Sequence, residues 1–234
     1  MKVFDKSLVT FGRHESFALR FGWITKGFSQ DLEIFGKDDA TIILGVGKNM
    51  VHSIRYWLIA SQIIKNEKGS LIPTDLGNRI FKLKGGHDPY LEDDATIWLL
   101  HWLIASNAKD ATTFFWFFNR FHKPEFTHKE LFDALCEFVN ENTNIKRKSK
   151  KTLDSDITLL LRMYEPTIDS KSKPAEEGLD SPLTLLGLIN KLDDSKYHES
   201  KLEDRWNFPL MPFSYAVLEV FESTQLSSLP IEQL

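Results

Sequence analysis

Apolar side chains recur every three to four residues along most of the chain, which is the period of an α-helix buried on one face. Clusters of glycine, proline, asparagine and aspartate interrupt this pattern and are typical of helix ends and turns. The pattern therefore predicts a mainly α protein. The expected helices cover approximately residues 13–28, 39–44, 48–63, 74–81, 95–106, 112–121, 127–140 and 152–164, with shorter ones near 181–189 and 213–221.

The elements expected between residues 38 and 79 follow the order of a winged helix-turn-helix. An aspartate at position 38 or 39 can cap a short helix, and Gly45–Gly47 ends it before a second helix opens at Lys48. A β-hairpin is expected at 66–72, and a new helix is expected to begin just after it, at Pro73. This order predicts an N-terminal winged helix-turn-helix, a module that lies against duplex DNA.

A break rich in glycine at residues 85–89 divides the chain into two predicted domains. Residues 1–85 form the winged helix-turn-helix DNA-binding domain, and residues 86–234 form a helical C-terminal domain. The basic loop 142–151 lies between two expected helices and is a candidate second helix-turn-helix, although no clear wing follows. A polar segment at 168–178 is predicted to be a mobile linker.

The helix that opens at Lys48 has an apolar side and a basic side. Val51, Ile54 and Leu58 cluster together, and Lys48 and His52 lie about a quarter turn away. A recognition helix needs this division, because one side packs inside while donors enter the major groove. The alternatives are that these cations are ordinary solvated side chains, or that the module docks on another protein. The predicted DNA-binding residues are Lys48, Asn49, His52, Ser53, Arg55, Tyr56, Lys65 and Lys68.

Charge and composition narrow the class of protein. The 234 residues carry a net charge of −4, so only a local feature can attract nucleic acid. Residues 48–85 are such a feature, because they contain seven Lys and Arg but only two acidic residues. The run Lys146–Lys151 is either a second phosphate-binding site or a solvated loop. An apolar share of 42% excludes a disordered chain. Since no signal peptide opens the chain and the most apolar window, 97–105, is too short to cross a bilayer, a cytoplasmic protein without membrane contact is expected.

Candidate chemistry rests on polar clusters within apolar sequence, because no standard catalytic motif is present. In the first cluster, Arg13 can hold a scissile phosphate, His14 can act as a general base and Glu15 can bind a metal ion. A second cluster before the apolar helix adds Glu92 and Asp93 to Glu15 as candidate Mg²⁺ ligands, since this ion prefers carboxylate oxygens. The structural alternatives are a helix N-terminus for the first cluster and a helix cap for the second.

Other polar residues on the expected helices are assigned structural roles. His101 lies inside the apolar helix and is expected to be a hydrogen-bonded core histidine. Asp154 and Asp156 are expected to be helix-start acids rather than ligands.

Several long segments together resemble a bacterial family catalogued as a domain of unknown function. They are Phe11–Trp23, Leu44–Trp57, Pro73–Gly77, Asp88–Trp102 and Leu160–Tyr164. The family is associated with DNA phosphorothioation systems and includes SspB-type DNA nicking enzymes. These work beside a cysteine desulfurase and an ATP-pyrophosphatase-like partner.

The resemblance implies a function for the chain. It would cut one strand of double-stranded DNA with Mg²⁺, so that sulfur can replace a non-bridging phosphate oxygen. The implied partners are a cysteine desulfurase, an ATP-pyrophosphatase-like protein and an ATPase of the same system. Two other functions remain open: a non-catalytic winged-helix DNA-binding subunit or transcriptional regulator, and an assembly module that grips another protein.

Overall fold

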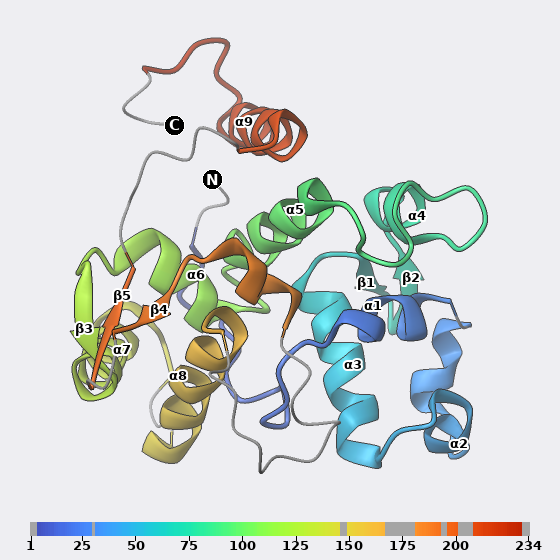
Figure 1. Ribbon diagram of the computed structural model, residues 1–234, viewed down its shortest axis with the longest axis horizontal. Helices are drawn as coiled ribbons and strands as arrows, with labels where there is room; N and C mark the ends of the chain where they lie inside the picture. Colours follow the sequence, from blue (N-terminus) through green and yellow to red (C-terminus); the bar gives the residue numbers. More distant parts are fainter. Residues whose placement is uncertain are drawn as a thin grey trace.

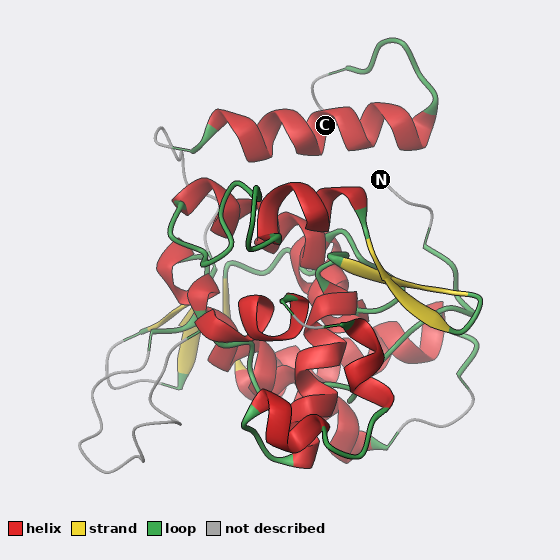
Figure 2. Cartoon of the chain, turned by 90° about the vertical axis from the view of Figure 1, so that its right-hand side faces the viewer, coloured by secondary structure: helices red, strands yellow, loops and turns green. Residues whose placement is uncertain are grey.

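The computed structural model describes residues 4–29, 31–145, 149–166, 181–192, 196–200 and 208–230. Helices make up most of it, with two small sheets at the periphery (Figures 1 and 2), which confirms the mainly α prediction. None of the described helices is both long and apolar enough to cross a membrane. The predicted linker at 168–178 and the basic residues 146–148 lie outside the described residues.

The N-terminal elements agree with the expected order from residue 39 onward. Helix α1 (Phe21–Phe28) and the 3₁₀ helix η1 (Leu32–Gly36) precede the short helix α2 (Ala40–Leu44), and α3 (Lys48–Ala60) follows. Gly45 ends α2 in the left-handed conformation at φ 61°, which glycine adopts without steric cost. The chain then turns directly into α3.

A β-hairpin follows α3, as the turn residues predict. Strand β1 (Ile64–Glu67) pairs antiparallel with β2 (Ser70–Pro73), and Glu67 lies opposite Ser70. The two-residue turn Lys68-Gly69 has positive φ at both positions, which matches the twist of the strands. Thr74 then caps α4 (Asp75–Phe81) by accepting a hydrogen bond from the Gly77 N–H.

The second half of the chain is built on four longer helices, α5 (Asp94–Ala105), α6 (Thr112–Arg120), α7 (His128–Asn142) and α8 (Lys150–Tyr164). The predicted capping box at the start of α7 is present, with Thr127 and Glu130 satisfying each other's backbone N–H groups. The consecutive rings of α6 from Phe114 to Phe117 are buried. His101 hydrogen-bonds the Tyr164 hydroxyl over 2.9 Å, as expected of a core histidine.

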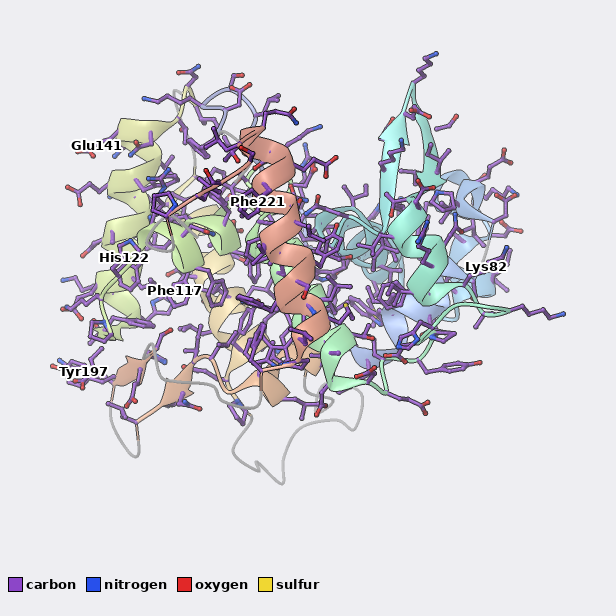
Figure 3. The ribbon with its side chains drawn as sticks, turned by 90° about the horizontal axis from the view of Figure 1, so that it is seen from above. Lys82, Phe117, His122, Glu141, Tyr197 and Phe221 are labelled. Carbon is purple, nitrogen blue, oxygen red and sulfur yellow. The ribbon has the colours of Figure 1, made fainter. Side chains whose placement is uncertain are left out.

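A second small sheet lies at the end of the molecule that carries α7. Strands β3 (Glu125–Thr127), β5 (Tyr197–Glu199) and β4 (Asn190–Lys191) form it in that order, all antiparallel. The 3₁₀ helix η2 (Pro182–Leu186) and helix α9 (Leu210–Thr224) complete the chain. Figure 3 shows α9 lying across the middle of the molecule, between the end with Lys82 and the end with Tyr197.

One apolar core joins the elements on both sides of the predicted boundary at residue 85. It extends from Phe11 and α3 through α5 and α6 to α8. Trp57 of α3 packs edge to face against Phe114 of α6, with ring centroids 5.6 Å apart. The side chains of α3 are therefore held in a fixed relation to those of the second half.

The first helix differs from its prediction. It begins at Phe21 and not near Arg13, and residues 12–20 form a loop. Glu15 and Ser16 have positive φ values of 51° and 63°, which an α-helix cannot accommodate. The apolar spacing of Phe17 and neighbouring residues resembles a helix face, but the loop is fixed by contacts with α8, distant in sequence.

Candidate functional site

Helix α3 presents the surface that its sequence pattern predicts. Val51, Ile54 and Leu58 are buried, whereas Lys48 and His52 are exposed. Asn49 is also exposed in the first turn of the helix. The donors near the N-terminus of α3 are thus free to meet a ligand.

Ser53 is a correction to the predicted contact set. Its side chain is fully buried and donates a hydrogen bond to the Phe17 carbonyl over 3.3 Å. The Trp57 indole N–H donates to the same carbonyl at 3.0 Å. Ser53 therefore anchors the loop before α1 and cannot reach a ligand.

The hairpin beside α3 carries two exposed lysines. Lys68 is at the turn, and Lys65 lies on β1, where it is 3.5 Å from the Glu67 carboxylate. Such an exposed pair is weak and leaves Lys65 able to exchange its partner.

The loop that was predicted to begin the first helix is organised by His14. This residue is buried, its Nδ1 accepts a hydrogen bond from the Ser16 N–H at 3.0 Å, and its Nε2 lies 2.8 Å from the Asp156 carboxylate. Because Nδ1 is an acceptor, Nε2 carries a proton and donates it to Asp156. Both ring nitrogens are committed, so His14 has no atom ready to take a proton from water.

Asp156 was expected to be a helix-start acid, and its place in the structure differs from that prediction. It is buried within α8, not at the helix start, where Ser149 occupies the N-cap position. Its carboxylate also accepts hydrogen bonds from the Gly12 N–H and the Thr113 hydroxyl, each at 2.9 Å. The sequence signal for its burial is its position on the apolar side of the helix, three residues after Leu153 and four before Leu160.

A cleft of about 530 Å³ opens beside this loop. It brings together two sets of residues that are far apart in the sequence. Arg13 and Glu15 come from the loop, and His52, Arg55 and Tyr56 come from α3. Thr10, Ile59 and Asp110 complete the lining, with Asp110 contributed by the connection between α5 and α6.

The charges of this cleft are not paired with one another. Among the ion pairs of the described residues, none joins Arg13 or Arg55 to Glu15 or Asp110. The Nε atom of Arg55 is buried and has no hydrogen-bond partner. Buried polar groups are nearly always satisfied, so this unpartnered atom is unusual.

Burial also changes the acidity of two groups in the cleft. It raises the pKa of Asp110, although the nearby Lys109 charge and a hydrogen bond with Asn107 oppose the change. Burial raises the pKa of Tyr56 well above its ordinary value, and the negative charges of Asp156 and Asp110 add to the effect. The Tyr56 hydroxyl therefore stays protonated at neutral pH and can donate a hydrogen bond.

Glu92 and Asp93 lie apart from this cleft lining and serve the start of α5. Asp93 caps the helix by accepting from the Ala95 N–H at 2.8 Å, and it lies 3.4 Å from His87. Glu92 is exposed, and its N–H donates to the buried Asp88. Within the described part of the chain, no three His, Cys, Asp or Glu side chains gather as a metal-binding group, so Glu15, Glu92 and Asp93 do not converge.

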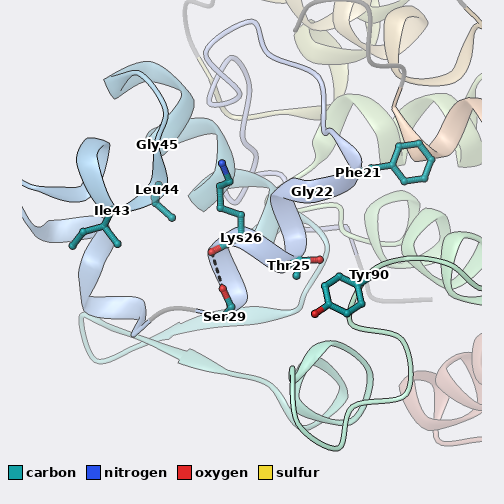
Figure 4. A pocket seen from close by; sticks show the side chains of 9 residues that line it. All are labelled: Phe21, Gly22, Thr25, Lys26, Ser29, Ile43, Leu44, Gly45 and Tyr90. Atoms are coloured by element: carbon teal, nitrogen blue, oxygen red, sulfur yellow. Dashed lines mark hydrogen bonds between the residues drawn. The ribbon is translucent and has the colours of Figure 1, made fainter. Parts of the chain in front are cut away.

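A second hollow of about 660 Å³ lies between α1 and α2. Figure 4 shows it lined by apolar side chains including Phe21 and Ile43, with Tyr90 at one side. Among the residues that the structure describes, Lys26 is the only charged one in its lining. It lacks the opposed charges that distinguish the cleft beside α3.

Fold and cleft together define a helical protein whose exposed basic helix adjoins a cleft with two arginines and two carboxylates. The chain belongs to the family described as protein of unknown function DUF4007, whose model matches residues 11–234. No curated protein is significantly similar to it.

Two solved structures of SspB are similar to the chain, and one of them contains a bound magnesium ion. Each is 29% identical over 92% of this chain, with TM-scores of 0.81 for the magnesium-bound structure and 0.80 for the other. The chain spans 66% of the length of each SspB chain.

Proposed function

We propose that the chain is a DNA-binding nicking endonuclease of a DNA phosphorothioation system, active in the cytoplasm. The observation that carries the proposal is the cleft in which the predicted catalytic residues Arg13 and Glu15 meet His52 and Arg55 of the predicted DNA-facing helix. A nuclease requires this adjacency, because the phosphate to be cut must lie within reach of the helix that binds the duplex. The similarity to SspB supports assignment to this kind of system.

The DNA-binding part of the proposal treats α2, α3 and the β1–β2 hairpin as a winged helix-turn-helix. The exposed donors Lys48 and Asn49 stand at the N-terminal end of α3, where a recognition helix meets base edges. Lys65 and Lys68 on the hairpin are in position to contact phosphates on the flanking backbone. Binding that depends on such phosphate contacts weakens as salt rises.

Magnesium fits the donor set of the cleft. Glu15 and Asp110 are the carboxylates of its lining, and Mg²⁺ is commonly held by one or two carboxylates together with waters and substrate phosphate. Glu15 is retained as a proposed ligand, and Asp110 replaces Glu92 and Asp93. When bound, the ion would neutralise charge on the phosphate and make a bound water more acidic.

The residues of the chain itself divide the remaining tasks. Arg13 holds the scissile phosphate, as its place in the cleft allows. His52 is exposed in the cleft and takes the proton of the attacking water, a role that His14 cannot fill with both nitrogens hydrogen-bonded. His14 and Asp156 instead hold the loop that carries Arg13 and Glu15.

The test is conversion of supercoiled plasmid to open circles by the pure chain with Mg²⁺, with an EDTA control. Glu15→Gln and Asp110→Asn are expected to abolish conversion while retaining duplex binding. Glu92→Gln is the matched control, because Glu92 is an exposed carboxylate outside the cleft, and it is expected to cut normally. Equal activity of all three variants would overturn the assignment of the cleft.

A second candidate function is a non-catalytic DNA-binding subunit. The exposed donors of α3 and the hairpin favour it, because they can contact duplex DNA without a metal ion. It predicts that the chain shifts duplex DNA in a gel and leaves plasmid intact at every Mg²⁺ concentration. In either case we propose the cysteine desulfurase, the ATP-pyrophosphatase-like protein and the ATPase of the same system as partners.

A further inference from the structure

The Arg55 guanidinium is held in a way that leaves one donor unused. Its Nε is buried and has no partner, although Glu15 and Asp110 line the same cleft. A buried donor without an acceptor costs free energy, so each such group calls for an explanation, and a bound ion is one of them. A ligand bound in the cleft that Arg55 lines can supply this acceptor.

The surroundings identify the ligand as a tetrahedral oxyanion. A guanidinium presents Nε–H and Nη–H as a fixed fork that matches two oxygens of a phosphate group. Arg13 supplies a second cation across the lining, and the neutral Tyr56 hydroxyl supplies a further donor. A tetrahedral phosphate group presents its oxygens in more directions than a planar carboxylate, so it can meet both arginines and a cation held by the two carboxylates.

We propose that Arg55 is the bidentate ligand of one phosphate group and that Arg13 contacts the same group. This inference deepens the proposed function. It depends on that function only in naming the bound phosphate group as a DNA phosphodiester. The surface cations on α3 and the hairpin position the duplex, whereas this subsite binds the single phosphate at the cleft.

The probe for the subsite is inorganic phosphate, measured by ³¹P NMR titration of the full chain with and without Mg²⁺. Arg55→Lys keeps the charge but lacks the Nε fork, so phosphate binding is expected to weaken by about tenfold or more. Arg79→Lys is the matched control, because Arg79 is exposed on α4 outside the cleft lining, and its phosphate binding should equal that of the wild type. Thermal unfolding of each variant establishes that it is folded.

The outcomes separate the inference from the proposed function. If Arg55→Lys binds phosphate more weakly but the wild type never cuts plasmid, the subsite is supported and the proposal of a nicking endonuclease is overturned. Wild-type phosphate binding by Arg55→Lys overturns the subsite, even if the wild type cuts plasmid. If Arg55→Lys fails to fold, Arg13→Lys is measured in its place, and unchanged phosphate binding by that variant also overturns the subsite.

Discussion

Replacing Asp156 by alanine removes one acceptor on which three buried or partly buried donors depend. The Gly12 N–H, the Thr113 hydroxyl and the His14 Nε2–H all lose their partner. Each buried donor left unsatisfied costs about 1–3 kcal/mol, and the three costs are not additive. We therefore expect the free energy of unfolding to fall by about 3–5 kcal/mol, which is less than the sum of the three largest costs.

An isosteric replacement separates the charge from the shape. Asp156→Asn keeps one carbonyl oxygen for two of the donors, and the Thr113 hydroxyl can turn to accept from the new amide. The expected loss is about 1–2 kcal/mol, since the charge-assisted bonds become neutral ones. Asp154→Ala is the control on the same helix, because its exposed side chain lies 3.8 Å from His128 and such a pair contributes at most about 1 kcal/mol.

The assay is equilibrium unfolding in urea followed by circular dichroism, with an unchanged dependence on urea as the sign that the folded state is intact. The reasoning also predicts that Asp156→Asn cuts plasmid poorly while it binds duplex normally. The loop with Arg13 and Glu15 loses its anchor in this variant, but the exposed face of α3 does not. A loss below about 1 kcal/mol for Asp156→Ala would refute the claim that this carboxylate organises the loop.

Two further predictions concern a glycine and a helix cap. Gly77→Ala would place a Cβ 2.3 Å from the Ile63 carbonyl oxygen, so we expect it to lower the free energy of unfolding, measured in urea, by about 1–3 kcal/mol. Gly22→Ala is the control, because its Cβ meets nothing within 4 Å and should leave the protein as stable as before or more stable. A Gly77→Ala variant as stable as the wild type would show that the close approach is not as described. Hydrogen bonds from Lys123 and from Thr127 together lower the pKa of Glu130 from its usual 4.5 to about 2, so their stabilisation is present above pH 4.5 and is lost as the pH falls toward 2. The stability difference between wild type and Glu130→Gln should shrink over that interval, and a difference independent of pH would contradict the argument.

Local signals predicted the elements that depend on neighbouring residues. The glycine break before α3, the turn at Lys68-Gly69 and the capping box at Thr127 each act within a few residues, so the sequence alone locates them. The buried rings of α6 were equally accessible, because consecutive aromatic residues rarely face water.

Elements fixed by distant contacts were beyond local reasoning. The loop around His14 looks like a helix start, and its shape is explained by hydrogen bonds to distant residues, such as the one from His14 to Asp156, 142 residues away. Strands β4 and β5 are two and three residues long, too short to give an alternating pattern, and they exist through pairing with each other and with β3. Asp110 was not predicted as a site residue, since nothing near it in the sequence indicates that it faces α3.

The candidate site was predicted in its components but not in its assembly. Arg13 and Glu15 were assigned to catalysis and Arg55 to DNA binding, and the three line one cleft. Ser53 was predicted to contact DNA but is on the buried side of α3, only two positions from Arg55. Apolar spacing does not locate the boundary between the two sides of a helix to a single residue, so this error could not be avoided from the sequence.

The most direct test of the account is photo-cross-linking of the chain to duplex DNA that contains bromodeoxyuridine, followed by identification of the cross-linked peptides. The account predicts cross-links in the peptide that spans residues 48–56, with further ones on the hairpin at 64–73. Cross-links confined to surfaces away from α3 and the hairpin, or none at a concentration that saturates binding, would contradict it.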